Sequence, residues 1–346
     1  MGNASHVMSI DANKYSIAQE STIGTAVVSG DLALLVTELE VDYPLGATFN
    51  VAQKARGVSY LKKPSTGGAD ITVLNRSQAG PTLPIMANAD SLALPLATFA
   101  QNISRSGAGP YVEQYDPMTT DAHRRVLKGA TSGDYGLTLL KRNDDDGTRA
   151  ETLAGCIMRA LTLTSSEDNP LNASLEFIGM TADTENDVNV TASFTDVDKD
   201  PILHSDLTVA IGGTDVDLIS QTITLSYERI KIHNANNNEP QGFIFGRVNV
   251  ALDLVIPWQE STSYVDYKAA ALAKTDYLYE MYKGSKTGAT AEDFYFKSNF
   301  VFSEDPKIEE IDGMKVWHLI GTGMNDGTNP AYQIILATAT SRITTM

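Results

Sequence analysis

The sequence predicts a mainly β protein that consists of two tandem β-sandwich modules, each with a flanking α-helix. Three observations support this fold class. Apolar side chains occupy every second position in several segments, which is typical of strands that bury one face. Segments rich in Asn, Asp, Gly and Pro separate these strands, as expected for the turns of antiparallel sheets. Finally, the two halves of the chain show a weak internal similarity, which indicates a repeated unit.

The clearest strand signals form a hairpin in the second half of the chain. Apolar residues alternate with polar or small ones from Val248 to Ile256, and a similar alternation begins at Ile223. The second pattern slips by one residue, which predicts a β-bulge near Glu228 or Arg229. Between the two strands, Asn234 to Gly242 has the Asn, Pro and Gly content of a hairpin loop.

Other segments complete the predicted sheets and add a few helices. Further strands are expected at 32–41, 135–141, 157–164, 173–178, 293–302, 316–320 and 334–340. One helix is expected at Leu92 to Ile103. A second is expected in the Ala-rich stretch from Val265 to Lys283, because Gly284 follows it as a helix C-cap would. Asp121 to Lys128 is expected to form a short third helix.

The internal similarity is faint and has two explanations. Gly30 to Val36 aligns with Ser205 to Ile211, and about the same offset places the two longer helices opposite each other. A rival match of Ala160 to Thr164 with Thr222 to Ser226 implies a different offset. The similarity therefore reflects either a repeated module or a chance resemblance between strands, whose patterns are generic.

The repeat, taken as a guide, divides the chain into two domains. The first is predicted at residues 1–190, with an N-terminal arm and an extended loop at about 45–84. The second is predicted at residues 191–346. The polar, acidic stretch from Thr181 to Asp200 is the expected linker between them.

Composition excludes several classes of protein. Forty-three acidic residues against 26 basic ones give a formal charge of -17, so the chain is not a conventional nucleic-acid binder, although DNA could slide past it without adhering. Cys156 is the single cysteine, which excludes an intrachain disulfide and cysteine-based metal clusters. No run of 18 apolar residues occurs, so no membrane span is expected, and the chain is expected to be soluble.

Motifs of catalysis or cofactor binding are absent from the sequence. The five histidines show no paired ligand spacing, so no metal, no cofactor and no enzymatic activity are expected, although a triad of distant residues stays open. Asp196 to Asp200 has the opening spacing of a calcium loop. Pro201 stands where that loop needs Gly, and Leu207 stands where it needs Glu, so a solvated acidic linker is the favoured interpretation.

Several segments together resemble the tail tube proteins of long-tailed bacteriophages. Residues 19–26, Gln-Glu-Ser-Thr-Ile-Gly-Thr-Ala, resemble the common opening of that family. Residues 154–164 and 169–179 resemble its Gly-Cys hairpin. The segments that resemble its closing strands are 201–213, 219–225 and 246–256. Residues 45–84 depart from the family pattern, and we interpret them as a loop that reaches the neighbouring ring.

The resemblance implies a structural virion protein. Copies of such a protein assemble in the host cytoplasm into rings of three two-module chains or six chains, and the rings stack into the tail tube, a conduit for DNA ejection. Its implied partners are further copies of itself, other tail proteins such as the tape measure and tail terminator, and genomic DNA in transit without specific binding. The alternative is a β-sandwich surface-binding protein, such as a capsid decoration or adhesin module.

Polar positions on the two best strands are the candidates for the tube lumen. On a strand with one buried face, the polar side chains point away from the core. A net negative lumen would repel DNA and keep it from adhering. The lumen-facing candidates are Thr224, Ser226, Glu228, Asn249 and Asp253.

Overall fold

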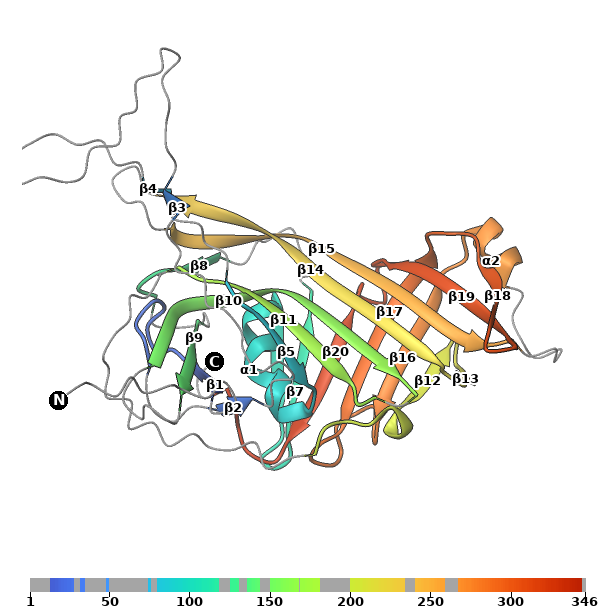
Figure 1. The fold of residues 1–346 in the computed structure, drawn as a ribbon, viewed down its shortest axis with the longest axis horizontal. Coiled ribbons are helices and arrows are strands. Elements are labelled where there is room, and N and C mark those ends of the chain that lie inside the picture. Colours follow the sequence, from blue (N-terminus) through green and yellow to red (C-terminus); the bar gives the residue numbers. More distant parts are fainter. Residues whose placement is uncertain are drawn as a thin grey trace, which may run out of the picture.

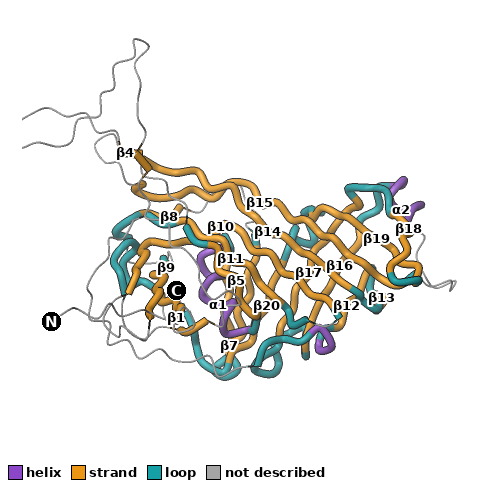
Figure 2. The backbone as a smooth tube through the Cα atoms, in the orientation of Figure 1, coloured by secondary structure: helices purple, strands orange, loops and turns teal. Residues whose placement is uncertain are grey.

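A computed structural model shows a mainly β protein, which confirms the predicted fold class (Figures 1 and 2). The structure describes residues 13–27, 32–34, 48–49, 74–75, 80–117, 125–130, 136–143, 150–167, 169–180, 200–233, 240–258 and 267–343. Every pairing between its strands is antiparallel, and all strands except β3 (Thr48–Phe49) and β4 (Leu74–Asn75) belong to one hydrogen-bonded network. In the part described, no helix has both the length and the apolar character needed to cross a bilayer.

The network forms two layers of a sandwich. They join at β17, which pairs with β20 within its own layer and, at its C-terminal end, with β19 of the other layer. The first layer contains, in spatial order, β5 (Thr82–Met86), β11 (Asn172–Ile178), β10 (Ala150–Ser166), β14 (Ser220–His233), β15 (Pro240–Pro257), β19 (Met314–Gly323) and β18 (Lys307–Ile311). The second contains β13 (Thr214–Val216), β12 (Thr208–Ile211), β16 (Tyr277–Lys283), β17 (Phe294–Phe302), β20 (Gln333–Thr338), β7 (Tyr111–Asp116) and β6 (Asn102–Ser106).

Apolar side chains from both layers meet between them. Ile223, Leu225 and Leu252 of the first layer are buried, as are Phe296 and Ile334 of the second. Polar contacts also cross the gap between the layers. Tyr279 on β16 donates a hydrogen bond to the Gln221 side chain on β14, and the hydroxyl groups of Tyr227 and Tyr332 lie 3.1 Å apart. Buried polar groups paired in this way fix how one layer sits on the other.

The long strand β10 belongs to two parts of the network. Its first half pairs with β9 (Leu137–Asn143), which continues to β1 (Asn13–Gln19) and β2 (Leu32–Leu34), whereas its second half pairs with β11 and β14. The register with β9 shifts between Leu153 and Cys156, where Gly155 has a φ of 66°. A bulge with glycine in the left-handed region bends a strand, so Gly155 allows β10 to turn from one sheet into the other.

The predicted hairpin is present as β14 and β15. The register shifts between Tyr227 and Arg229, which confirms a bulge near Glu228 or Arg229. The extra residue lies on β15, because Val248 and Phe245 are three positions apart whereas their partners on β14 are two apart. Beyond the bulge, β15 also pairs with β8 (Arg125–Leu127). Most of the predicted loop, residues 234–239, lies outside the described residues.

Helix α1 (Ala89–Phe99) is entirely buried and packs against β10 and β20. A capping box begins it: the Asn88 side chain accepts a hydrogen bond from Ser91 N at 2.8 Å, and Ser91 Oγ accepts one from Asn88 N at 3.0 Å. The prediction of a helix here is confirmed, but its bounds were wrong. The helix ends at Phe99, and Ile103 lies in β6.

The second predicted helix is wrong over most of its length. Helix α2 covers only Tyr267–Ala273, after which Lys274 adopts a φ of 52° that ends it. Residues Tyr277–Lys283 form β16 instead, because this strand pairs with β12 on one edge and β17 on the other, and tertiary pairing outweighs local helix propensity. The predicted helix at 121–128 is also wrong at residues 125–127, which form β8; residues 121–124 lie outside the described residues.

Both layers contain strands from both halves of the chain, so two separate modules are not confirmed. β10 pairs with β14, and β7 pairs with β20. The rival internal match has a simple basis, since Leu161 and Leu225 are direct partners on these neighbouring strands. The boundary at residue 190, the linker up to 199 and most of the extended loop at 45–84 lie outside the described residues. The division into 1–190 and 191–346 stays a prediction.

Candidate functional site

Six strands of the first layer present a continuous outward face, which we call the hydroxyl face. It is formed by the partly or fully exposed alternate residues of β5, β11, β10, β14, β15 and β19. These residues are Thr82, Pro84, Met86, Asn172, Ser174, Glu176, Ala160, Thr162, Thr164, Ser166, Ser220, Thr222, Thr224, Ser226, Asn249, Ala251, Asp253, Val255, His318, Ile320 and Thr322. Most carry a hydroxyl group, an amide or a small apolar side chain.

Strand register aligns these residues into rows that cross the whole face. One row passes through direct cross-strand partners on all six strands. Its members, in order, are Pro84, Ser174, Thr162, Thr224, Ala251 and Thr322. The hydroxyl oxygens of Thr162 and Thr224 lie 3.5 Å apart. Directly opposed threonines stabilise neighbouring strands, so the face is built as a regular, small-residue surface.

The structure brings four of the five predicted lumen residues together on the hydroxyl face. Ser226 and Asn249 are direct cross-strand partners, and Thr224 lies two residues from Ser226. Asp253 is opposite Thr222. Glu228 lies on β14 at the register shift, opposite Gly246 and Arg247 of β15, and is exposed there. Sequence reasoning missed the contributions of β5, β10, β11 and β19, which only the strand order reveals.

Charges on this face occur mostly in pairs. The Glu176 carboxylate accepts a hydrogen bond from Arg159, the neighbour of Ala160 on β10. Asp253 Oδ1 lies 2.8 Å from His318 Nε2. The residues of the hydroxyl face named above include no lysine, and exposed Arg247, two positions before Asn249 on β15, adds one arginine to it. A surface of paired charges and hydroxyl groups offers few of the phosphate contacts on which DNA affinity depends.

His318 lies between two carboxylates at the edge of this face. Its Nε2 contacts Asp253, and its Nδ1 lies 3.3 Å from Glu309 Oε1 on β18. Partial burial lowers the pKa of His318, but the hydrogen bonds and charges of the two carboxylates outweigh this effect and raise the pKa above its ordinary value. When it is protonated, the imidazole ties β18 and β15 to β19.

We expect the stability of the fold to depend on the protonation of His318. Because the pKa is higher in the folded chain, the contribution is fully present below the unfolded pKa of about 6.5 and is lost as the pH rises through the raised folded value. Thermal unfolding between about pH 5 and 9 measures this, with His318→Gln as the comparison. At low pH the wild-type protein should unfold at a higher temperature than the variant, and this difference should disappear at the upper end of the pH range. The same difference in unfolding temperature at every pH would contradict the assignment of this contribution to protonated His318.

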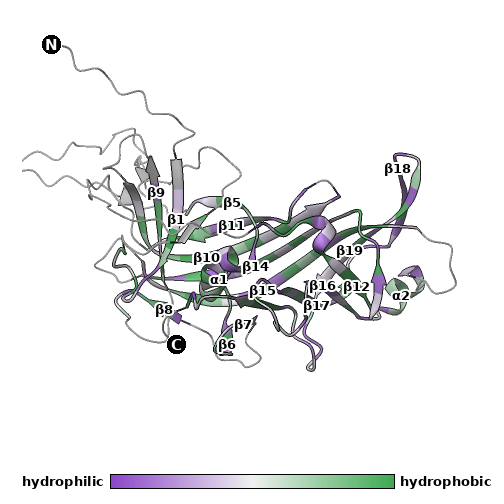
Figure 3. Ribbon diagram, turned by 90° about the horizontal axis from the view of Figure 1, so that it is seen from below, coloured by the Kyte–Doolittle hydropathy of each residue, from purple (hydrophilic) through white to green (hydrophobic). Residues whose placement is uncertain are grey.

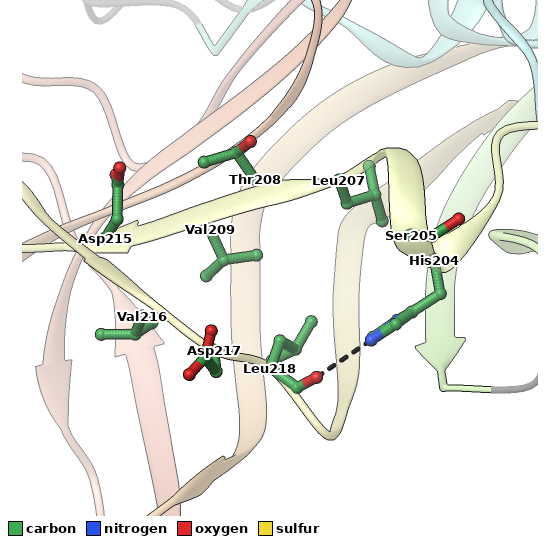
Figure 4. Close-up of a pocket in the computed structure, with 9 residues that line it drawn as sticks. All are labelled: His204, Ser205, Leu207, Thr208, Val209, Asp215, Val216, Asp217 and Leu218. Carbon is green, nitrogen blue, oxygen red and sulfur yellow. Dashed lines mark hydrogen bonds between the residues drawn. The ribbon is translucent and has the colours of Figure 1, made fainter. Parts of the chain in front are cut away.

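A hollow of about 540 Å³ is lined by residues of the segments 204–209 and 215–218, none of which belongs to the hydroxyl face (Figure 4). His204 borders it. The Leu218 carbonyl accepts a hydrogen bond from His204 Nε2 at 2.9 Å, so Nδ1 is unprotonated in neutral His204 and accepts one from the Ser165 hydroxyl. This is the proton arrangement of a nucleophile and its base. Ser165, however, is only 4% exposed, so the pair serves to tie β10 to the segment before β14.

Asp215 and Asp217 also line the hollow, together with Thr208 (Figure 4). Among the residues that the structure describes, no three His, Cys, Asp or Glu side chains are grouped as metal ligands would be. Residues 196–199 of the calcium-like motif lie outside the described ranges.

A buried carboxylate joins two of the segments that carry the family resemblance. Glu20 is 3% exposed and accepts hydrogen bonds from Gly24 N at 2.7 Å, Gly155 N at 2.8 Å and the Thr138 hydroxyl at 2.8 Å. Burial raises the pKa of Glu20, and the three hydrogen bonds oppose that rise. The opening segment and the Gly-Cys segment are thus held together by one side chain.

Comparison with known families agrees with this architecture. The chain matches the family model of the phage tail tube protein over residues 9–312. A search of curated proteins finds no match. The matched range includes the Glu20 contact, the β14–β15 hairpin and five of the six strands of the hydroxyl face in full. Because the match covers most of the chain, this protein belongs to the phage tail tube protein family, a family of structural proteins of the virion tail.

Proposed function

We propose that copies of this tail tube protein assemble into rings, that the rings stack into the tail tube, and that DNA leaves the virion through it. The observation that carries this proposal is the hydroxyl face: a broad sheet surface, six strands wide, with small side chains and paired charges. Such a surface suits the wall of a channel. A ring of three two-module chains and a ring of six chains both remain compatible with it.

The hydroxyl face is the surface that we assign to the lumen. Thr224, Ser226 and Asn249 would line its middle, and Asp253 and Glu228 would add negative charge. DNA affinity comes largely from basic side chains that displace counterions. Arg159 is paired with Glu176, and the exposed Arg247, two positions before Asn249, is near exposed Glu228 at the bulge. DNA would therefore pass without adhering.

The proposal also includes the partners of a tail under assembly. Tape measure and tail terminator proteins are expected to contact the tube, and assembly is expected to occur in the host cytoplasm. Genomic DNA is a passing partner that is not specifically bound. Chemistry is not part of this role, since a conduit acts through its shape and its charge.

Electron microscopy of the purified protein tests the function. Rings or hollow tubes are the expected result at concentrations that favour assembly. Discrete particles that never form rings or tubes, and that bind glycans or a capsid surface, would contradict the proposal. That result would favour a capsid decoration or adhesin module.

A cysteine at Thr224 tests the assignment of the lumen. Thr224→Cys should react with both a small maleimide and a maleimide on a large polymer in the unassembled protein, because Thr224 is partly exposed. In tubes, we expect reaction with the small reagent only, since it can enter the open ends. Reaction with both reagents would place Thr224 on the outside, and reaction with neither would place it in a subunit interface. Wild-type protein is the control, because its Cys156 is buried.

A further inference from the structure

The β18–β19 hairpin projects from one end of the molecule, and its charge is strongly acidic. Figures 1 and 3 show β18 at the end of the long axis that lies opposite β8. Residues 303–315 contain five acidic side chains and two lysines. The acidic residues are Glu304, Asp305, Glu309, Glu310 and Asp312. All five residues of β18 are exposed, on both faces of the strand. We call residues 303–315 the acidic hairpin.

Apolar side chains accompany these charges. Ile308 is 47% exposed, Ile311 is 37% exposed and Met314 is 45% exposed. Helix α2 lies beside the hairpin, since Tyr267 packs against Trp317 with ring centroids 5.8 Å apart, and Leu272 on this helix is 85% exposed. Exposed strands that carry apolar residues on both faces are characteristic of surfaces that a partner covers.

The opposite end of the molecule has the complementary charge. It is formed by β8 with the turn after it, and by the part of the β14–β15 hairpin beyond the bulge. We call these segments together the basic arm. Its described residues are 125–130, 229–233 and 240–245, and these include four basic side chains and no acidic one. The basic residues are Arg125, Lys128, Arg229 and Lys231, of which Arg125 and Lys231 are exposed.

The basic arm also exposes apolar side chains. Leu127 is 43% exposed and Ile230 is 49% exposed, and both positions are linked through β15, where Ile230 is opposite Ile244 and Leu127 is opposite Gly242. In the described part of the chain, eight large apolar residues are exposed, and six of them lie on the basic arm, the acidic hairpin or α2. The large exposed apolar side chains are thus concentrated on or beside the two charged ends of the molecule.

We propose that the acidic hairpin of one copy docks on the basic arm of a second copy. The two surfaces match in charge and both offer apolar side chains, yet they lie at opposite ends of the long axis and so do not meet within one chain (Figure 1). A contact between two different patches of identical chains is head-to-tail, and such contacts close into rings or continue as filaments. This inference rests on the proposed self-assembly and adds the surfaces that carry it.

Charge reversal at each end tests the contact. The hairpin variant is Asp305→Lys/Glu310→Lys, and the arm variant is Arg125→Glu/Lys231→Glu. All four residues are exposed, and circular dichroism checks that each variant folds. Like charges placed opposite each other disfavour a contact, so each variant should raise the concentration at which assembly begins by about tenfold or more. The chain with all four substitutions should assemble at nearly the wild-type concentration.

Matched controls separate this contact from a general effect of charge. Glu167→Lys/Asp200→Lys reverses two exposed acids away from both ends and should leave assembly unchanged. The neutral variant Asp305→Asn/Glu310→Gln should shift assembly in the same direction as the reversal, by less. Added salt should weaken wild-type assembly, because it screens the contact.

The outcomes distinguish this inference from the proposed function. Wild-type rings or tubes that neither reversal affects would overturn the docking of hairpin on arm and leave the tube function intact. Failure of the four-substitution chain to recover, when both double variants fold, would overturn it as well. Wild-type protein that stays monomeric at every concentration would overturn both.

Discussion

Replacement of Glu20 by alanine is expected to lower the free energy of unfolding by about 3–5 kcal/mol. The carboxylate accepts hydrogen bonds from Gly24 N, Gly155 N and the Thr138 hydroxyl, and it is almost fully buried. Its removal leaves three donors without an acceptor in a place that water reaches poorly. Each such donor costs about 1–3 kcal/mol, although the costs do not simply add.

Chemical denaturation followed by tryptophan fluorescence measures the loss. Glu20→Gln keeps the shape but offers an amide group to one of the donors, so it should cost about 2 kcal/mol. Ser21→Ala, at the exposed neighbouring residue, is the control and should change stability by less than about 0.5 kcal/mol. If Glu20→Ala were as stable as that control, the carboxylate would not hold the two segments together.

Gly321→Ala should destabilise the fold by about 2–3 kcal/mol. Gly321 lies on β19, where this strand pairs with β15 on one side and β17 on the other. A Cβ atom there would lie 2.4 Å from Phe300 Cδ2, and Phe300 is only 1% exposed, so its ring has little room to move. The glycine therefore allows the two layers to join at this corner.

A double-mutant cycle tests this explanation. Phe300→Leu shortens the side chain that meets the new methyl group, so Gly321→Ala should cost about 1–2 kcal/mol less in that background. Thr322→Val, at the exposed next position on the same strand, should alter stability by less than about 0.5 kcal/mol. Equal costs of Gly321→Ala in both backgrounds would mean that contact with Phe300 is not the cause.

The period-2 patterns predicted the long central strands well. The β14–β15 hairpin and its bulge follow from the positions of Ile223, Tyr227 and Val250, because one face of each strand is buried and the other is not. The short strands β5, β6, β7, β13 and β18 were missed. The β18 residues are exposed on both faces, so no alternation of burial marks them in the sequence.

Local propensity misled the assignment of helices where tertiary pairing decides the structure. The segment Tyr277–Lys283 follows a true helix and contains Leu, Glu, Met and Lys, which favour helices. Its pairing with β12 and β17 fixes it as a strand. Of the candidate site, the sequence identified residues on β14 and β15. The neighbours of those strands could not be predicted, because β10 and β19 are distant in sequence.

The His318 contacts could not be found by motif search for a similar reason. Its two carboxylate partners lie 9 and 65 residues away, and they meet it through the pairing of β19 with β18 and β15. Histidine paired by sheet register leaves no local spacing signal. In the sequence, His318 therefore looks like an isolated side chain.

The pairing of early strands with late strands constrains when the protein can fold. β7 pairs with β20, and Arg342 Nε lies 2.8 Å from Asp90 Oδ1 on helix α1, a separation of 252 residues. Contacts between distant segments form slowly, because long loops must close first. During synthesis, β7 and helix α1 must therefore wait for nearly the whole chain to emerge before their partners exist. We expect a nascent chain to be unable to join a growing tube, so that subunits are added only after release from the ribosome.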